Sequence, residues 1–310
     1  MARNIDNIKI TVVMPVYREK IEHLRMAIES ILDQTWKNIQ LIIILDDPNN
    51  SLLKNVINDY IEKDSRVLLY INEENMGCPY SKDRGIKLAE TEYVAIMDAD
   101  DIARPFRLEK QIHRIVEKQL DIVAGCVKVI NDNGDPLYCM DNLPADHNDI
   151  AKKMKVNNCM PHPTWLLKKE VYINLGGYVD MQGCEDYDFL IRAIRGGYRL
   201  GTVGEIVLDY RLSEKSVSRN SLYKQYLMMQ YLQDKYYRHK YNYQTYEDIY
   251  NRKYTEKRAE KYAKASVYFE EALVYKGNSR YFRMLVSIVK VLVSSKDYCV
   301  KVLRYVMQNK

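Results

Sequence analysis

The first half of the chain alternates short apolar runs with stretches in which apolar residues recur at helical spacing. Apolar runs rich in β-branched residues predict strands at 8–14, 39–45, 67–71 and 93–97. Amphipathic stretches predict helices at 21–32, 52–62, 81–89 and 106–117. The run at 39–45 is apolar at almost every position, as in a strand that helices cover on both faces. The pattern predicts an α/β fold, Rossmann-like, with a mostly parallel central sheet flanked by helices.

Charge and composition divide the 310 residues into two parts. Residues 1–214 contain 27 Lys and Arg against 34 Asp and Glu, whereas residues 215–310 contain 20 against 8. The second part also holds 16 of the 27 tyrosines and, from Tyr223 onward, few glycines and no proline. We therefore predict an α/β domain at 1–214 and a basic, Tyr-rich, α-helical C-terminal region at 215–310.

Cysteine usage bears on the compartment. The six cysteines are scattered singly without a CxxC pair, and no basic, apolar signal precedes the first predicted strand. No apolar run reaches the roughly 20 residues that a bilayer-spanning helix needs. These features favour a reduced, cytoplasmic protein without a disulfide framework.

Carboxylates follow two of the predicted strands. Asp46-Asp47 follows the second strand, and Asp98-Ala99-Asp100-Asp101 follows the fourth. Ligands of α/β folds bind beyond these strand ends, and three carboxylates within four positions repel one another unless a cation offsets them. A solvated acidic turn with Asp101 capping the next helix is the alternative. Acidic ends on two neighbouring strands favour Mg²⁺ or Mn²⁺, because only oxygen ligands are present.

A second acidic run lies later in the chain. Glu185-Asp186-Tyr187-Asp188 precedes an apolar helix predicted at 189–194. Acidic residues at a helix N-terminus are common capping chemistry, so this run alone does not indicate a site.

The order and spacing of several segments resemble the family 2 glycosyltransferases, which have the GT-A fold. The resemblance covers roughly residues 8–218. The matching segments are 12–18, 30–36, 43–47, 75–77, 81–85, 95–101, 176–178 and 185–188. The Asp98-Ala99-Asp100 segment matches the family's DxD element, and the pair Glu185-Asp186 matches its catalytic acidic pair.

The resemblance implies a role for each matching residue. Asp100, with Asp98, is expected to hold Mn²⁺ or Mg²⁺ at the diphosphate, and Asp46 to accept the N3–H of uracil. Asp186 is expected to be the general base, with Glu185 as its neighbour. The implied donor-binding residues are Pro15, Val16, Tyr17, Glu19, Asp46, Asn75, Gly77, Lys82, Asp98, Ala99 and Arg211.

These roles imply an inverting enzyme that transfers a single sugar from a UDP-sugar to an acceptor hydroxyl. The acceptor is expected to be a glycan or a lipid-linked sugar, in the biosynthesis of a cell-surface polysaccharide or glycan. The Gln-x-x-Arg-Trp segment of the processive polysaccharide synthases does not occur in the sequence, which favours transfer of single sugars.

The chain departs from the family pattern at three places. Pro48-Asn49 stands where Gly-Ser is usual, and Asp83 stands where an asparagine is common. Ser213 replaces a histidine that often lies near the diphosphate, which puts one contact to the metal or diphosphate in doubt.

Three other functions fit parts of the pattern. A sugar-nucleotidyltransferase needs a glycine-rich loop with a basic residue after the first strand, and a dinucleotide-dependent oxidoreductase needs GxGxxG there. The chain has Met14-Pro15-Val16-Tyr17 at this place. A catalytically silent nucleotide-sugar-binding protein is the third alternative, and the retained Asp186 argues against it.

The basic C-terminal region ends in a predicted amphipathic helix. Polar residues recur at spacings of three and four along one face of it: Arg283, Ser287, Lys290, Ser294, Asp297, Lys301 and Arg304. The helix is expected to dock on its own domain, on the second subunit of a homodimer, or on an anionic membrane surface. The last alternative places the protein at the inner face of the membrane. No recognised nucleic-acid-binding module supports a nucleic-acid partner.

Overall fold

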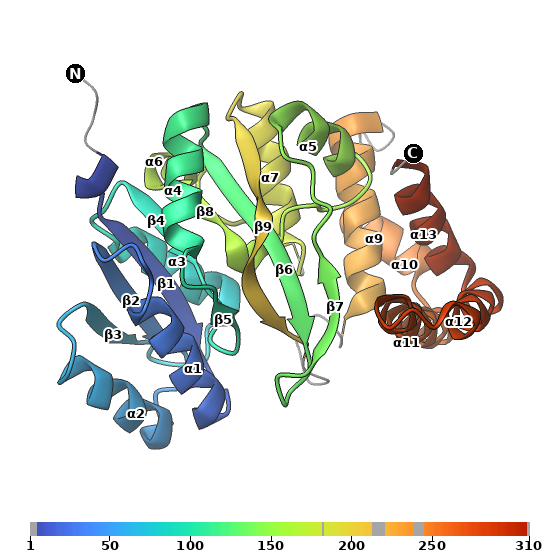
Figure 1. The fold of residues 1–310 in the computed structure, drawn as a ribbon. Coiled ribbons are helices and arrows are strands. Elements are labelled where there is room, and N and C mark those ends of the chain that lie inside the picture. Colours follow the sequence, from blue (N-terminus) through green and yellow to red (C-terminus); the bar gives the residue numbers. More distant parts are fainter. Residues whose placement is uncertain (1–4, 182, 213–220, 239–244, 309–310) are drawn as a thin grey trace.

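The computed structural model describes residues 5–181, 183–212, 221–238 and 245–308. Within them, nine strands form one mixed sheet with the order β3-β2-β1-β4-β8-β6-β9-β5, and β7 pairs with β6 (Figure 1). Ser213 and the predicted boundary between residues 214 and 215 lie outside the described residues. The strands are β1 (Ile10–Val16), β2 (Ile39–Leu45), β3 (Val67–Ile71), β4 (Tyr93–Ile96), β5 (Ile102–Ala103), β6 (Ile122–Ile130), β7 (Pro136–Met140), β8 (Leu166–Lys168) and β9 (Leu200–Arg211).

The N-terminal half of the sheet is parallel, as predicted. Strands β1 to β4 pair only in parallel with one another. The other half is mixed, because β8 runs antiparallel between β4 and β6, whereas β6 and β9 are parallel. The prediction of a mostly parallel sheet thus describes the half formed by β1–β4.

Two apolar cores lie on opposite faces of the sheet. Along β2, Leu41, Ile43 and Leu45 belong to one core, whereas Ile42 and Ile44 belong to the other. This alternation explains the continuous apolar run in the sequence, since both faces of the strand are buried. The first core includes side chains of α1 (Ile21–Leu32), α2 (Ser51–Ile61) and α4 (Arg107–Lys118). The second includes side chains of α3 (Cys78–Leu88), α5 (His147–Met154), α6 (Lys169–Asn174) and α7 (Glu185–Arg195).

Two predicted boundaries near the site change in the structure. The first strand runs to Val16 rather than residue 14, so Pro15 and Val16 lie inside the sheet. Pro15 is tolerated there because β4 pairs with β1 only as far as Val13, which leaves one side of Pro15 outside the ladder. The helix predicted at 189–194 begins at Glu185, so the acidic run is its first turn. Short 3₁₀ turns occupy Ile5–Asn7 and His162–Thr164.

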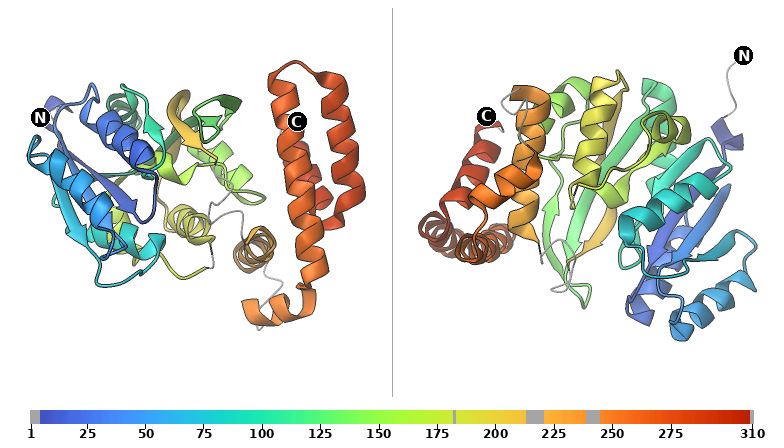
Figure 2. Two further views of the ribbon diagram at one scale, coloured as in Figure 1. Left: turned by 90° about the horizontal axis from the view of Figure 1, so that it is seen from below. Right: turned by 180° about the vertical axis from the view of Figure 1, so that it is seen from behind.

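The C-terminal region is helical, as predicted. It contains α9 (Leu222–Gln233), a π-helical turn at Asp234–Arg238, α10 (Tyr246–Lys253), α11 (Glu256–Gly277), α12 (Tyr281–Ser294) and α13 (Lys296–Gln308). In α9, Met228 and Leu232 join the core that holds α7, while Tyr223 and Tyr226 pack against Tyr262 of α11. Figure 2 shows α11 and α12 side by side at the edge of the molecule.

The prediction of one final helix carrying a single polar stripe is wrong. Ser295 is extended (φ −146°, ψ 117°) and separates α12 from α13. Its Oγ accepts a hydrogen bond from the Tyr298 backbone N–H at 3.3 Å, so the serine begins a new helix instead of continuing the first. No helix in the described part of the chain is both long enough and apolar enough to cross a bilayer.

Candidate active site

The predicted donor residues meet at the carboxyl ends of β1, β2 and β4. Val16 and Leu45 are register partners, and the Asp46 N–H donates to the Val16 carbonyl at 2.7 Å. Tyr17 and Asp46 therefore leave the sheet side by side. The Tyr17 N–H donates to Glu19 Oε2 at 2.7 Å, and Arg18 pairs with Asp47 at 3.2 Å. The loop after β1 is thereby fixed next to the loop after β2.

Asp46 is buried and organises the loop that leads into α3. Its Oδ1 accepts from Asn72 Nδ2 at 2.5 Å and from the Met76 N–H at 2.9 Å, and its Oδ2 accepts from the Gly77 N–H at 2.8 Å. Asn75 Oδ1 accepts from the same Gly77 N–H at 3.2 Å. A carboxylate offers about four acceptor positions, so one position on Oδ2 remains for a further donor. Gly77 has φ +88°, a conformation that favours glycine.

Lys82 connects α3 to the DxD element. Its Nζ lies 2.7 Å from Asp98 Oδ1, and its side chain is almost fully buried. Burial alone would lower the pKa of Lys82, but the Asp98 carboxylate outweighs it and raises the pKa. Lys82 is therefore a buried, fixed cation at the end of β4.

Two further carboxylates crowd this cation. Asp100 lies near Asp98 and Glu19, and burial followed by those charges raises its pKa. Glu19 has a raised pKa for the same reason, burial first, with Asp98 contributing. Ala99 between the two aspartates is buried. A bound cation relieves the repulsion between carboxylates that lie this close together.

Asp101 does not cap the following helix, so that alternative is wrong. Strand β5 intervenes, and α4 begins at Arg107 without a side-chain cap. Asp101 is fully buried, and its Oδ1 accepts from the Arg211 N–H at 2.7 Å. Burial, together with Asp100, raises the pKa of Asp101. Its role is to tie the DxD loop to β9.

The Arg211 guanidinium group also stabilises the loop that contains Asp98 and Asp100. Nε donates to the Asp100 carbonyl at 2.8 Å, and Nη1 donates to the carbonyls of Asn131 and Asp132 at 3.0 and 2.8 Å. Among the described residues, Arg211 Nη2 and Asp101 Oδ2 are buried without a hydrogen-bond partner. Hydrogen-bonding capacity thus remains unused beside the DxD element.

These residues fit a divalent cation that is coordinated partly by the protein and partly by a bound substrate. Within the described residues, no three His, Cys, Asp or Glu side chains are grouped closely enough to enclose a metal ion. Mg²⁺ is commonly bound by one or two carboxylates plus substrate phosphates. Asp98 and Asp100 supply the carboxylates, and the unused hydrogen-bonding capacity at Asp101 and Arg211 suits a polar ligand nearby.

The acidic pair lies in the first turn of α7, and Asp186 is held at both oxygens. Oδ1 accepts from the Tyr187 N–H at 2.7 Å, and Oδ2 accepts from Asn158 Nδ2 at 2.8 Å. Burial, followed by the Glu185 charge, raises the pKa of Asp186 to about 6. A carboxylate with this pKa is ionised at neutral pH and is a stronger base than an exposed one.

Asp188 is committed to structure. Its Oδ2 pairs with Arg192 Nε at 2.7 Å, its Oδ1 accepts from the Tyr236 hydroxyl at 3.0 Å, and its side chain is fully buried. The remaining candidates for a base in this helix are therefore Asp186 and Glu185.

An aromatic cluster lies beside the turn between α6 and α7. Gly176 and Gly177 have φ of +75° and +73°. The Tyr178 N–H donates to the Tyr172 hydroxyl at 3.2 Å, and that hydroxyl donates to Asp83 Oδ1 at 3.0 Å. A Cβ on Gly177 would lie 2.8 Å from the same Asp83 oxygen. Asp83, the departure from the family's asparagine, thus accepts a hydrogen bond that positions this turn.

Sequence reasoning assigned no role to Asn158 or His162. His162 Nε2 lies 2.7 Å from the Tyr178 hydroxyl, and the His162 and Trp165 ring centroids are 4.5 Å apart. Burial, with Lys82 nearby, lowers the pKa of His162, so its imidazole is neutral. The Asn158 contact to Asp186 joins a loop to a helix and leaves no sequence signal.

Lys82 interacts electrostatically with both halves of the site. The charges of both Asp98 and Glu185 act on Lys82, and the charge of Lys82 acts on Asp186. The charges of Lys82, Asp98 and Glu185 also act on the Cys78 thiol, which lies one turn before Lys82. The structure thus brings the DxD element and the acidic pair of α7, nearly 90 residues apart in sequence, into one electrostatic neighbourhood.

Comparison with known proteins shows what this chain is similar to. The family model described as glycosyl transferase family 2 matches residues 11–176. An uncharacterized glycosyltransferase of Methanocaldococcus jannaschii is 33% identical over 216 residues, covering 69% of this chain and 74% of that protein. The O-antigen biosynthesis glycosyltransferase WbnJ of Escherichia coli is 31% identical over 215 residues, covering 69% and 83% of the two chains.

A solved structure supports the fold. The crystal structure of S. aureus TarS matches 89% of this chain and 54% of the TarS chain, with a TM-score of 0.56 and 14% sequence identity. The predicted GT-A architecture with C-terminal helices is confirmed by this likeness and by the sheet described above. Together with the family match over more than half of the chain, these findings show that the protein belongs to glycosyltransferase family 2.

Proposed function

We propose that this glycosyltransferase moves a single sugar from a UDP-sugar to an acceptor hydroxyl, with inversion at the anomeric carbon. One observation carries the proposal: Asp186, with a pKa raised to about 6, lies within electrostatic reach of Lys82, which is paired with the DxD aspartate Asp98. A base and a charge-binding region are thus adjacent, as displacement of a nucleoside diphosphate requires.

Uridine recognition is assigned to Asp46. One acceptor position on its Oδ2 remains after the three protein donors are counted. The N3–H of uracil is a donor that fits this position, whereas cytosine presents a lone pair to it. A buried carboxylate facing a lone pair is strongly disfavoured, which makes Asp46 selective.

Asp98 and Asp100 are proposed to hold Mn²⁺ or Mg²⁺ together with the donor diphosphate. When bound, the cation supplies neutralisation of the charge that develops on the departing diphosphate. Lys82 contributes a second, permanent positive charge next to Asp98. Arg211 keeps the loop of both aspartates in place through its bonds to main-chain carbonyls.

Asp186 acts as the general base in a single displacement. The acceptor hydroxyl gives its proton to an Asp186 oxygen and forms the new bond to the anomeric carbon. The bond to the diphosphate breaks at the same time, and UDP takes its electron pair. Attack from the face opposite UDP inverts the centre, so an α-linked donor yields a β-linked product. The base contributes roughly 10²–10⁴-fold to the rate.

The acceptor is proposed to be a glycan or a lipid-linked sugar in the synthesis of a surface polysaccharide. WbnJ, a relative that aligns over 83% of its length, is named for O-antigen biosynthesis. A polar cluster around His162 and Tyr178 lies near the base, where it suits a sugar hydroxyl.

A ligand screen tests this proposal. Thermal shift with UDP-, GDP- and CDP-sugars in Mn²⁺ should give stabilisation by UDP-sugars alone, because ligands that bind the folded state raise its melting temperature. EDTA and the variant Asp100→Ala should each remove most of the shift. Equal stabilisation by CDP-sugars would exclude the role of Asp46, and an unchanged shift in Asp100→Ala would exclude the metal assignment.

A further inference from the structure

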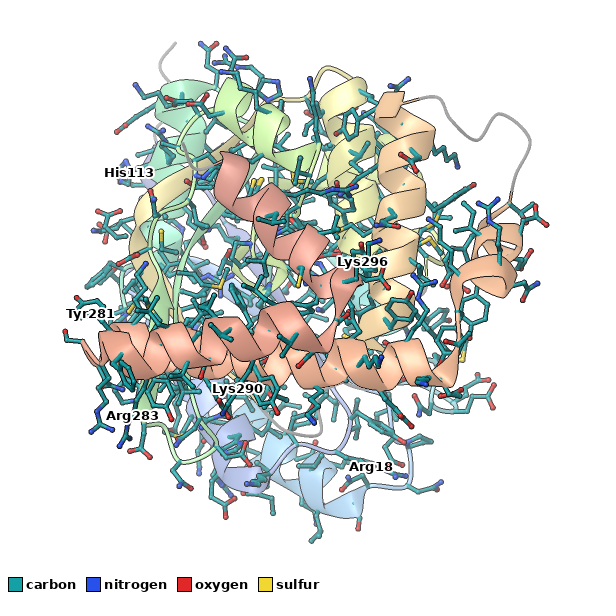
Figure 3. All side chains as sticks on the ribbon, turned by 90° about the vertical axis from the view of Figure 1, so that its right-hand side faces the viewer. Arg18, His113, Tyr281, Arg283, Lys290 and Lys296 are labelled. Carbon is teal, nitrogen blue, oxygen red and sulfur yellow. The ribbon has the colours of Figure 1, made fainter. Side chains whose placement is uncertain are left out.

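One face of α12 is apolar and exposed. Figure 3 views the molecule from the side of the C-terminal helices, with α12 in front. Phe282 and Val293 are each 80% exposed, a larger fraction than for any other bulky apolar side chain described. We call the set of exposed apolar residues here the α12 apolar face: Tyr281, Phe282, Leu285, Val286, Val289, Leu292 and Val293. At 100° per residue these positions fall within one arc of the helix.

The opposite side of α12 holds it on α11. Ser287 is buried and its hydroxyl donates to Glu271 Oε2 at 3.2 Å, next to the buried Val291. At the border between this side and the exposed one, Lys290 Nζ lies over the Tyr268 ring, 5.1 Å from its centroid. A surface helix usually buries its apolar stripe and exposes its polar one. Helix α12 instead leaves most of its bulky apolar residues exposed, so its apolar face is left for an external partner.

Basic side chains border this face, and α12 contains no acidic residue. Arg283 and Lys290 are exposed, and at 100° per residue they fall at one edge of the apolar arc. Figure 3 labels both residues on α12. Lys296, at the start of α13, and Arg280, just before α12, are also exposed. An apolar strip edged by cations complements a surface that is apolar inside and anionic at its rim.

A second copy of the chain fits this face less well. A two-fold contact through α12 would bring Arg283 and Lys290 close to the same residues of the other copy. Like charges placed opposite one another at an interface are unfavourable. A bilayer with anionic headgroups has the opposite charge, and the 14 residues of α12 span about 21 Å, enough to lie along its surface.

We propose that the α12 apolar face binds the surface of an anionic lipid bilayer. Phe282, Leu285 and Val293 enter the boundary between headgroups and acyl chains, and Arg283 and Lys290 contact lipid phosphates. The helix lies in the plane of the membrane without crossing it. This contact is separate from the residues assigned to donor binding, so it holds whichever sugar nucleotide the enzyme uses.

Sedimentation of the full chain with vesicles tests the proposal. Vesicles of phosphatidylcholine with phosphatidylglycerol should bind the protein, and 0.5 M salt should release most of it, because salt screens the headgroup charge. Vesicles of pure phosphatidylcholine should bind at least ten-fold less. Equal binding to both vesicle types, or binding to neither, overturns the proposal.

Paired variants separate the contribution of the apolar residues to vesicle binding from that of the basic residues. Phe282→Ser with Val293→Ser should weaken binding at least ten-fold, whereas Leu52→Ser, 66% exposed on α2, should leave it unchanged. Arg283→Gln with Lys290→Gln should weaken it roughly thirty-fold, given about 1 kcal/mol for each basic residue. The exposed pair Lys37→Gln with Lys54→Gln is the matched charge control.

Ultracentrifugation of the same variants tests whether the α12 apolar face binds a second copy of the chain instead of a membrane. The wild-type chain and the Phe282→Ser, Val293→Ser variant should sediment alike without lipid. A wild-type dimer that this variant converts to a monomer would assign the face to a second copy and overturn the proposal.

Discussion

At the residue scale, Asp186 is the side chain whose protonation state controls the proposed chemistry. Its raised pKa of about 6 means that the free enzyme holds a proton there below that pH and a base above it. We therefore expect kcat/KM to fall about ten-fold per pH unit below pH 6 and to level off above it. Initial-rate measurements from pH 4.5 to 8 with saturating Mn²⁺ check this, and an acid limb centred near pH 4 would contradict it.

Substitution of Asn158 should change the pH at which the acid limb of the kcat/KM profile lies. Its amide donates to the ionised form of Asp186 at 2.8 Å, which lowers the pKa of the carboxyl. Asn158→Ala should therefore shift the acid limb to higher pH and lower kcat, with little change in UDP affinity. Asn174→Ala, an exposed amide bonded to Tyr198, is the control and should leave the pH profile unchanged. A variant of Asn158 with lower activity but an unmoved limb would give the residue a purely structural role.

Sequence alone predicted Asp98-Ala99-Asp100 and the acidic pair Glu185-Asp186 as site residues, because each is a contiguous motif. Asn158 and His162 were not assigned for the opposite reason. Each acts through a tertiary contact, to Asp186 and to Tyr178, that no local pattern encodes. Asp101 shows the same limit, since its partner is the Arg211 main chain, more than 100 residues away.

At the element scale, the loop between β3 and α3 is held by one carboxylate. Asp46 accepts hydrogen bonds from the Met76 and Gly77 N–H groups and from Asn72. Asp46→Asn keeps the shape of the side chain but turns an NH₂ group toward these donors. We expect a loss of about 1–3 kcal/mol in the free energy of unfolding, the cost of leaving buried donors unpaired.

The same variant should lose UDP affinity. Urea denaturation measures the change in stability, and calorimetry measures UDP binding at a temperature where the variant is folded. Asp59→Asn, on an exposed aspartate of α2 that pairs with Arg25 at 3.6 Å, is the matched control and should change both quantities little. Wild-type stability in Asp46→Asn would show that the loop does not depend on this carboxylate.

Strands were easier to predict than the ends of elements. A strand buried on both faces is marked along its whole length by apolar residues, as β2 is. The break between α12 and α13 depends on Ser295, and serine is also compatible with a continuous helix. Helical periodicity passes through such a break without interruption, which is why one final helix was predicted.

At the scale of the whole molecule, α9 belongs to the packing of the glycosyltransferase fold. Met228 and Leu232 lie in the same core as Phe189 and Leu190 of α7. A chain that ends at residue 212 would expose this apolar surface, so we expect it to aggregate or to melt at a much lower temperature. A chain that ends at Asn278 keeps α9 and most of its contacts.

The chain that ends at Asn278 should therefore retain UDP binding. Scanning calorimetry and UDP titration of the two truncated chains measure both properties. A chain ending at residue 212 that is as stable as the full chain would contradict the shared core. The division of composition at residue 215 predicted the helical character of the second part, but composition carries no information on how helices pack across it.

Mixed pairing in the second half of the sheet also depends on the whole molecule. Strand β8 is three residues long and lies between β4 and β6, and its place in the order follows from long-range pairing. A short apolar run of this kind predicts a strand at most, and never its neighbours. Parallel β1–β4 could be predicted because each strand is followed by a helix that returns the chain to the same end.

In the proposed mechanism, Asp186 removes the acceptor proton in a site shared with the donor. The most direct measurement compares turnover and UDP affinity of the wild-type chain and Asp186→Asn in the same buffer. Asp186→Asn should bind UDP and Mn²⁺ as the wild type does and lose at least 100-fold in kcat, the lower end of a general-base contribution. Near-full turnover with unchanged UDP affinity would contradict the account and would make Glu185 the base to examine next.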